Sequence, residues 1–467
     1  MWFSRYGSHG NPQQYKDTMA MGPLPLTQTF ESQAKILIKA SEDNIARIES
    51  QIRGLERLRD QERGNIARLR MAIAPVSKAS CRASGGNLLL AHTTPRLWTE
   101  RLMIDLNKTP TAAYISCVKE WLKRSAPIRI PVELKISEKG VEAGPLMDEM
   151  AAVAYRWGSA NLDLPSLSLL SRIPAAGLKS LVYLSLQSED VKHHEKTRPF
   201  RTAEHLHRVF LRTHHTSRLL LPWSQLTDID VSDPSPQECL DTLLQCTTVV
   251  SAQFYTSAWS DFPDLSQRPI TTLGRLKVLR LSFDSLGDFV APFFVCLALP
   301  VLAKLTLTLD IDHTWPSAEF TQFQLRSPNI ERLTFGMSAM EPPDLLAVLQ
   351  HAPLLVALDM DCCLYCFDDS IIGGLQYSAT DAVYLTPKLE RLSLSYAGTN
   401  FDEDTLDAMI QSRWWTDEQL LSLPSSPKVA RWSHVDIYCD DGADNVSSDF
   451  KARIEEYRSQ GLDISVS

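Results

Sequence analysis

The sequence predicts an α/β solenoid, a curved stack of short repeats with parallel strands on the concave face and helices behind them. Three observations lead to this prediction. A six-residue apolar pattern recurs between residues 157 and 394, its copies are almost evenly spaced, and stretches with helical periodicity separate them. One such unit cannot bury its own apolar face, whereas stacked units share a continuous core.

The recurring pattern is L-x-x-L-x-L, in which the last two apolar residues face the core from a short strand. Its clear copies are Leu181, Leu184, Leu186; Leu276, Leu279, Leu281; Leu302, Leu305, Leu307; Ile330, Leu333, Phe335; Leu355, Leu358, Met360; and Leu389, Leu392, Leu394. The weaker copies are Leu206, Val209, Leu211; Leu226, Ile229, Val231; and Val249, Ala252, Phe254, with Trp157, Ala160, Leu162 as an earlier unit.

The spacing of these copies predicts a leucine-rich-repeat horseshoe. From Leu181 on, successive copies begin 20 to 28 residues apart, and a last step of 34 indicates an insertion. Leucine-rich repeats have about 20 to 29 residues. The alternative is an ordinary α/β domain with leucine-rich strands. Apolar residues with helical spacing between the strands are Leu240, Leu243, Leu244; Leu345, Leu346, Leu349; and Leu406, Met409, Ile410.

Within L-x-L, the intervening residue and the one after it point away from the core, so we expect partner binding there. The side chains at these positions are polar and of both charges, which suits a protein partner. The predicted substrate-binding residues are Ser185, Gln187, Asp230, Tyr255, Arg280, Ser282, Thr306, Thr308, Thr334, Asp359, Asp361, Ser393 and Ser395.

The N-terminal part differs in composition and in the spacing of its apolar residues. Residues 1–28 are rich in Gly, Pro, Gln and Ser, which predicts a disordered lead. Residues 29–74 predict a long amphipathic helix, either a dimeric coiled coil or a helix that folds onto its own chain, since Gly54 and Gly64 weaken it. Its heptad positions are Ile38, Ile45, Ile52, Ile66 and Ile73, with Ile48, Leu55 and Leu69 in the second series.

Composition excludes several classes of protein. The formal net charge of -9 disfavours a nucleic-acid partner, since no long basic stripe offsets the acid. The first residues do not have the pattern of a secretory signal, and the apolar stretch 289–303 is shorter than the ~20 residues of a membrane span. Nine scattered cysteines fit reduced thiols. We expect a cytoplasmic or nuclear protein without a membrane partner.

Three clusters contain residue types that can bind metals or undergo redox chemistry. Cys363 and Cys366 form a C-x-x-C, with Cys362 adjacent, but no second ligand pair lies nearby in the sequence. We therefore expect these cysteines to be buried residues of a repeat and not zinc ligands or a redox-active dithiol. No nucleotide-binding or hydrolase motif occurs, and we expect no enzyme, cofactor or metal. The other clusters, read as surface residues, are the histidines His193, His194, His205, His207, His214 and His215, and the acids Asp436, Asp440, Asp441 and Asp444.

Several short motifs occur in a fixed order along the chain. They are Ile73-Ala74-Pro75-Val76, Thr94-Pro95-Arg96-Leu97-Trp98, Trp121-Leu122-Lys123-Arg124-Ser125, Arg156-Trp157, Ser412-Arg413-Trp414 and Gly461-Leu462-Asp463-Ile464. Their order resembles that of fungal F-box and leucine-rich-repeat proteins, especially those of mushroom-forming fungi. The resemblance implies that an F-box docks on the Skp-type adaptor of a cullin-RING ubiquitin ligase while the repeats select a protein substrate.

The chain departs from this family where the F-box should lie. No L-P-x-E-I-L type string occurs between Val76 and Thr93, a stretch too short for three packed helices. We therefore assign 75–127 to a degenerate F-box-like region and 128–467 to the repeats, and expect little or no adaptor or cullin binding. The alternative is a repeat scaffold, dimeric through residues 38–73, with no ligase role. The remnant of the adaptor-binding helix would be Leu88, Leu89 and Leu90.

Overall fold

The computed structural model describes one compact unit, Thr94–Ser467. The predicted disordered lead, the heptad helix and Leu88, Leu89 and Leu90 lie outside the described residues. Those residues run from 94 to 466, without 100, 137–140, 175–176, 189–195, 197, 214–215, 233–234, 257–268, 284–290, 310–314, 364–365, 381–382, 397–400, 424 and 439–446.

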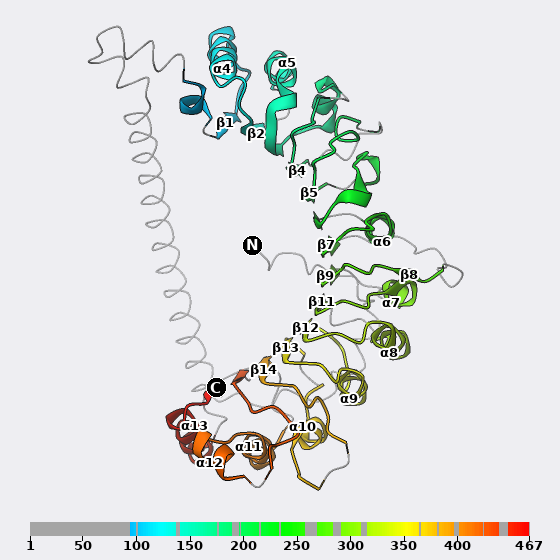
Figure 1. Ribbon diagram of the computed structural model, residues 1–467, viewed down its shortest axis with the longest axis vertical. Helices are drawn as coiled ribbons and strands as arrows, with labels where there is room; N and C mark the ends of the chain where they lie inside the picture. The colour runs from blue at the N-terminus through cyan, green and yellow to red at the C-terminus, as the bar shows by residue number, and fades with distance from the viewer. Residues whose placement is uncertain are drawn as a thin grey trace, which may run out of the picture. The chain divides into compact units, whose positions relative to one another are not determined.

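A fourteen-stranded parallel sheet forms the spine of this unit, and its strands follow one another in chain order. The sheet lines the concave side, with the helices outside it (Figure 1). Its strands are β1 (Leu102–Leu106), β2 (Ile130–Ile136), β3 (Trp157–Asp163), β4 (Tyr183–Gln187), β5 (Arg208–Arg212), β6 (Asp228–Ser232), β7 (Ser251–Thr256), β9 (Val278–Phe283), β11 (Lys304–Thr308), β12 (Arg332–Gly336), β13 (Ala357–Asp361), β14 (Arg391–Ser395), β15 (His434–Tyr438) and β16 (Asp463–Val466). A separate pair is β8 (Thr271–Thr272) and β10 (Leu297–Ala298).

The connections between strands on the convex side are α-helices in some repeats and 3-10 turns in others. The predicted helical residues are confirmed in α6, α9 and α11, where Leu240, Leu345 and Leu406 are fully buried. The α-helices are α4 (Ala112–Arg124), α5 (Gly144–Ala152), α6 (Pro236–Gln245), α7 (Ala291–Cys296), α8 (Ser317–Arg326), α9 (Pro342–Gln350), α10 (Asp369–Leu375), α11 (Glu403–Ser412), α12 (Asp417–Ser422) and α13 (Ser448–Ser459). The 3-10 turns are η1 (Pro95–Trp98), η2 (Ala154–Arg156), η3 (Leu167–Arg172), η4 (Thr216–Arg218) and η5 (Trp223–Gln225).

The apolar residues of the repeat pattern form one core behind the sheet. Leu305 pairs in register with Leu279 on one side and Leu333 on the other, so equivalent leucines lie side by side in successive repeats. Each of these three is at most 1% exposed. The sequential strand order and this ladder of equivalent leucines define a leucine-rich-repeat solenoid and exclude the alternative of an ordinary α/β domain.

The sheet begins earlier than the predicted boundary at residue 128, which therefore needs correction. Leu102, Ile104 and Leu106 of β1 are buried and pair with β2, so part of the region assigned to a degenerate F-box belongs to the solenoid. The pattern search missed β1 because it lacks the leading leucine of L-x-x-L-x-L. It also missed β15, whose unit begins with Trp432.

Buried arginines join neighbouring repeats at the turns. The guanidinium of Arg156 donates to the carbonyl oxygens of Leu122 and Ile128, at 2.7 and 2.9 Å, and to the Ser125 hydroxyl. These carbonyl oxygens lie where α4 ends and the next strand begins. No N–H group of a helix donates to these oxygens, so Arg156 of the following repeat supplies the hydrogen-bond donors.

Arg413 repeats this arrangement near the C-terminal end. It is fully buried, donates to the carbonyl oxygens of Leu389 at 2.7 Å and Ala430 at 3.3 Å, and stacks over the ring of Trp432 at 4.5 Å. Burial lowers the pKa of Arg413 to about 10, a value at which it stays charged at neutral pH. The motifs Arg156-Trp157 and Ser412-Arg413-Trp414 therefore have a structural role.

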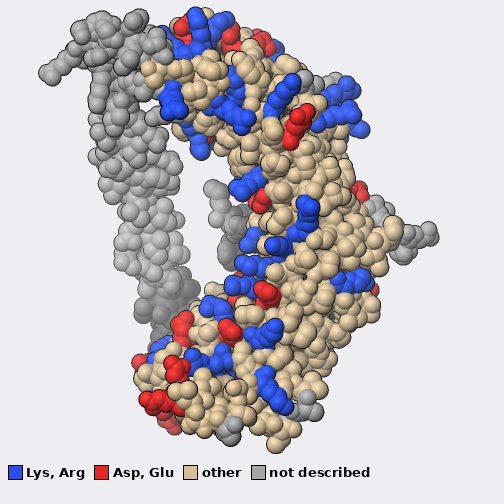
Figure 2. Space-filling model, viewed as in Figure 1, with Lys and Arg blue, Asp and Glu red and all other residues tan. Residues whose placement is uncertain are grey.

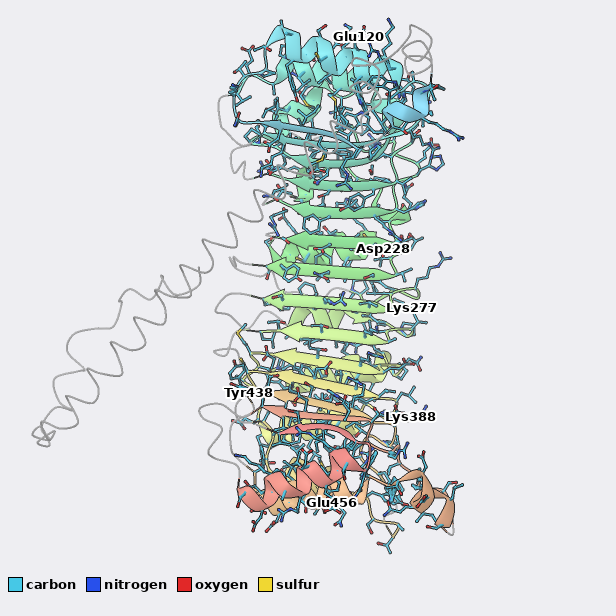
Figure 3. The ribbon with its side chains drawn as sticks, turned by 90° about the vertical axis from the view of Figure 1, so that its left-hand side faces the viewer. Glu120, Asp228, Lys277, Lys388, Tyr438 and Glu456 are labelled. Atoms are coloured by element: carbon cyan, nitrogen blue, oxygen red, sulfur yellow. The ribbon has the colours of Figure 1, made fainter. Side chains whose placement is uncertain are left out.

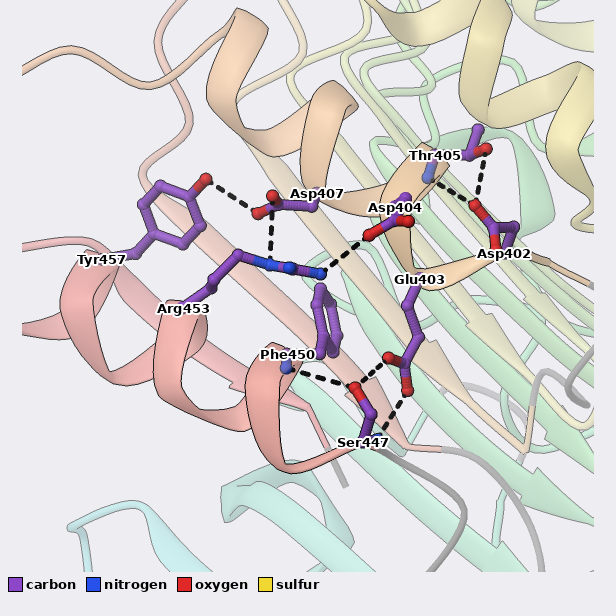
Figure 4. Close-up of polar contacts among 9 residues, drawn as sticks. All are labelled: Asp402, Glu403, Asp404, Thr405, Asp407, Ser447, Phe450, Arg453 and Tyr457. Carbon is purple, nitrogen blue, oxygen red and sulfur yellow. Dashed lines mark hydrogen bonds and ion pairs between the residues drawn. The ribbon is translucent and has the colours of Figure 1, made fainter.

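The last helix closes the solenoid through a polar network (Figure 4). Arg453 of α13 lies 3.1 Å from a carboxylate oxygen of Asp404 and 3.2 Å from one of Asp407, both on α11. The Tyr457 hydroxyl donates to Asp407 at 2.8 Å, and burial together with this carboxylate raises the pKa of Tyr457. These contacts attach the last helix to the helix of the preceding repeat.

We expect Arg413→Met to destabilise the protein by about 3 kcal/mol, because each buried carbonyl that loses its donor costs about 1 to 3 kcal/mol. Urea unfolding followed by circular dichroism measures this. Arg391→Met serves as the control, since Arg391 is exposed and has no ion pair with a described residue. Equal urea midpoints for the two variants would contradict the proposed role of Arg413.

Candidate functional site

The outward-facing side chains of the strands form three columns across the concave face. Figure 3 shows the strands of this face stacked one above the other. Strand register aligns them from repeat to repeat, so the first, third and fifth residues of neighbouring strands lie side by side. The first column runs Tyr183, Arg208, Asp228, Ser251, Val278, Lys304, Arg332, Ala357, Arg391 and His434. The middle column runs Ser185, Phe210, Asp230, Gln253, Arg280, Thr306, Thr334, Asp359, Ser393 and Asp436, and the last column Gln187, Arg212, Ser232, Tyr255, Ser282, Thr308, Gly336, Asp361, Ser395 and Tyr438.

All thirteen predicted substrate-binding residues lie in the middle and last columns. Their role in binding stays a prediction. Ser185 needs correction as a contact residue, since it is only 9% exposed and its short side chain lies beside Phe210 in the register. The others are partly or fully exposed, namely Gln187, Asp230, Tyr255, Arg280, Ser282, Thr306, Thr308, Thr334, Asp359, Asp361, Ser393 and Ser395.

Sequence reasoning missed the whole first column and several members of the other two. The first column stands one residue before the second leucine of L-x-x-L-x-L, where strand alternation also points a side chain outward. The first column was therefore predictable, because the alternation of inward and outward side chains begins one residue before the L-x-L segment. Phe210, Arg212 and Gln253 were missed in repeats where the pattern is weak.

The centre of the surface is a group of six side chains on β5, β6, β7 and β9, which we call the central patch. Arg280 donates to the Gln253 side-chain oxygen at 3.4 Å, and the Gln253 amide donates to the Tyr255 hydroxyl. The Arg212 guanidinium lies 5.8 Å from the centre of the Phe210 ring. Aromatic and arginine side chains dominate the energetics of protein interfaces. The patch consists of Phe210, Arg212, Asp230, Gln253, Tyr255 and Arg280.

Asp230 is the least satisfied member of the central patch. Burial raises the pKa of its carboxyl, and the nearby charges of Arg212 and Arg280 only partly oppose that effect. Its Oδ1 atom is buried without a hydrogen-bond partner. A buried acceptor in this state costs free energy that an incoming N–H or ammonium group would recover. Because Asp230 as a whole is partly exposed, its carboxylate can accept a donor from a ligand.

The C-x-x-C cysteines lie inside the repeats. Cys363 occupies the ninth position of its repeat, where leucine-rich repeats carry Asn or Cys, and its Sγ lies 3.5 Å from the Asp361 carbonyl oxygen. Cys363 and Cys366 are 2% and 0% exposed. A hydrogen bond from Cys366 lowers the pKa of Cys363 and, together with burial, raises that of Cys366.

The remaining clusters show no metal-binding geometry where they are described. His205 and His207 are exposed, and within the described part of the chain no group of three His, Cys, Asp or Glu side chains could hold a metal ion. The other predicted cluster residues His193, His194, His214, His215, Asp440, Asp441 and Asp444 lie outside the described residues.

A cleft of about 550 Å³ lies behind the sheet, between η4, η5 and α6. Its main carboxylate, Glu238, is already engaged, since it accepts from the Ser217 hydroxyl and caps α6 together with Ser235. Its wall also contains the apolar residues Leu221 and Trp223. Glu238 therefore stabilises a helix terminus, and the concave face remains the stronger candidate.

Comparison with solved structures finds leucine-rich-repeat proteins. An internalin (inlF) from Listeria monocytogenes is 13% identical, with 64% of this chain and 82% of that chain covered. The protein LegL7 from Legionella pneumophila is 12% identical, with 77% and 97% covered, and both TM-scores are 0.35. No protein-family model and no curated protein matches the chain. Scores this low carry no argument, so the assignment as a leucine-rich-repeat protein rests on the register above.

No helix in the described ranges is both long enough and apolar enough to cross a bilayer.

We expect Asp230→Asn to stabilise the protein at pH 7. Because the folded-state pKa of Asp230 is raised, the protonated carboxyl favours folding below its unfolded pKa of about 3.9, and this contribution is lost as pH rises through the folded pKa. Urea unfolding at pH 7 and pH 4 should show an advantage for the variant that shrinks at the lower pH.

Asp228→Asn is the matched control for this measurement, since Asp228 lies in the same strand but pairs with Arg208 at 3.5 Å. It should give no such gain. If Asp230→Asn were no more stable than the parent protein at pH 7, burial of the Asp230 carboxylate would not destabilise the fold.

Proposed function

We propose that this chain is a non-enzymatic protein receptor whose concave repeat face binds a protein partner. Leucine-rich-repeat folds generally bind proteins. The observation that carries the proposal is the central patch, in which aromatic and arginine side chains surround an unsatisfied carboxylate on an open, regular sheet. This combination has the composition of an interface centre rather than of a solvated surface.

A finer proposal is that the partner is the substrate of an SCF-type ubiquitin ligase. Its support is the ordered set of motifs that resembles fungal F-box and leucine-rich-repeat proteins. Two of those motifs contain Arg156 and Arg413, which join neighbouring repeats, so the resemblance extends to residues with a defined structural purpose. Such a receptor would work in the cytoplasm or nucleus.

The second candidate is a repeat scaffold with the same binding face and no ligase role. The missing L-P-x-E-I-L string between Val76 and Thr93 favours it, and residues 38–73 would supply a dimer contact. The two candidates differ in adaptor binding and agree on the concave face.

We expect Arg280→Glu and Asp361→Lys each to weaken partner binding at least tenfold without unfolding the protein, because a reversed charge repels the group it once attracted. Affinity purification with quantitative mass spectrometry measures the loss, and thermal melting checks the fold. Matched reversals away from the face are Lys123→Glu on α4 and Glu418→Lys on α12, both at exposed residues. If Arg280→Glu and Asp361→Lys retained every specific partner, the concave face would not be the binding surface.

We also expect the chain to bind a Skp-type adaptor weakly or not at all, because the F-box string is missing. Co-expression followed by size-exclusion chromatography tests this. A version in which a complete F-box replaces residues 76–93 is the positive control. A stoichiometric complex with the unaltered chain would refute the expectation and favour the ligase role.

A further inference from the structure

Five cations on β5 to β14 cross the concave face without an ion pair to any residue in the described ranges. We call this set the basic band. All five are exposed, although the whole chain has a net charge of -9. Figure 2 shows Lys and Arg side chains along this inner margin of the molecule. Unpaired like charges on one face of an acidic protein create a local field that attracts an anionic partner. The basic band consists of Arg212, Arg280, Lys304, Arg332 and Arg391.

The band follows a diagonal path. It begins with Arg212 in the last column on β5, passes Arg280 in the middle column on β9, and continues in the first column on β11, β12 and β14. Neighbouring strands lie about 4.8 Å apart, so the path from β5 to β14 spans roughly 34 Å. An extended chain advances about 3.3 Å per residue, and about ten residues would cover this path.

The acidic residues of the same face leave the path open. Asp359 and Asp361 on β13 lie in the middle and last columns, whereas the first column there has Ala357, which carries no charge. Glu331 and Glu390 each precede a first-column arginine by one residue, lie outside β12 and β14, and are exposed. A ligand that follows the diagonal therefore meets cations without crossing the carboxylates of Asp359 and Asp361.

One end of the path is the central patch. Phe210 and Tyr255 offer aromatic surface there, and Tyr255 is 45% exposed. The Asp230 carboxylate is partly exposed and can accept a backbone N–H from an extended chain. Nucleic acid would bring phosphates to the cations but would place anionic groups near Asp230 as well. A peptide brings carboxylates, N–H donors and apolar side chains together.

We propose that the basic band and the central patch bind an extended, acidic segment of about ten residues in the protein partner, with an aromatic or apolar residue at the Phe210 and Tyr255 end. This proposal rests on the proposed function and specifies the chemistry of its ligand. The segment lies across the strands, its carboxylates face the five cations, and its backbone donates to Asp230.

Selection of phage-displayed random dodecapeptides on the full chain tests the proposal. We expect the selected sequences to be enriched in Asp and Glu, with an aromatic or apolar residue near one end. Fluorescence anisotropy of a labelled selected peptide should show at least tenfold weaker binding to Arg280→Glu and to Arg332→Glu. Lys123→Glu, the same charge change on α4, should bind it as the parent does, and added salt should weaken binding.

Several results would overturn the proposal: no acidic consensus among the selected peptides, full binding by Arg280→Glu and Arg332→Glu, or tighter competing binding by a single-stranded RNA oligonucleotide of similar length. Its failure can be told from that of the proposed function. Partner capture that is lost with Asp361→Lys but kept with Arg280→Glu and Arg332→Glu would preserve a concave binding face and refute the acidic segment. Capture unaffected by all three would refute both.

Discussion

The parallel register between successive repeats is the constraint on which the rest of this structure depends. No repeat can satisfy its own strand or bury its own leucines, so each is stabilised by the two beside it, as Leu305 is by Leu279 and Leu333. The same register decides the outer surface. Since alternate residues of a strand point to opposite sides, fixing the leucines in the core also fixes three columns of side chains on the concave face. Fold and binding surface follow from one set of hydrogen bonds.

The arginines of this chain divide into two groups with opposite environments. Arg156 and Arg413 are buried and donate to carbonyl oxygens at the turns that flank the strands, where those oxygens have no helical or strand partner. The cations of the basic band are exposed and have no ion pair with a described residue. Burial therefore separates arginines that hold repeats together from those available to a partner. Asp230 is a different case. Burial of its carboxyl costs stability with no gain in packing, as expected at a functional position.

Much of the solenoid was predictable from the sequence, for reasons visible in single repeats. Copies with leucine in all three positions, such as the one beginning at Leu276, became strands in the expected register, and the helix around Leu406 formed where its spacing indicated. The predictions failed where other residues take the leucine positions. Trp432 fills the first position of the β15 unit, because the core accepts any apolar side chain of suitable volume there.

The sequence by itself determined the kind of repeat, the face of each strand that meets the core, and most of the residues that point outward, because these depend on periods of two and 3.6 within a short segment. Only the tertiary structure decided which outward residues become neighbours. Arg212 and Arg280 act on the same carboxylate of Asp230, and Arg413 donates to the carbonyl oxygen of Leu389, 24 residues earlier in the chain. Those contacts join residues far apart in the sequence, and tertiary packing, which no local pattern encodes, brings them together.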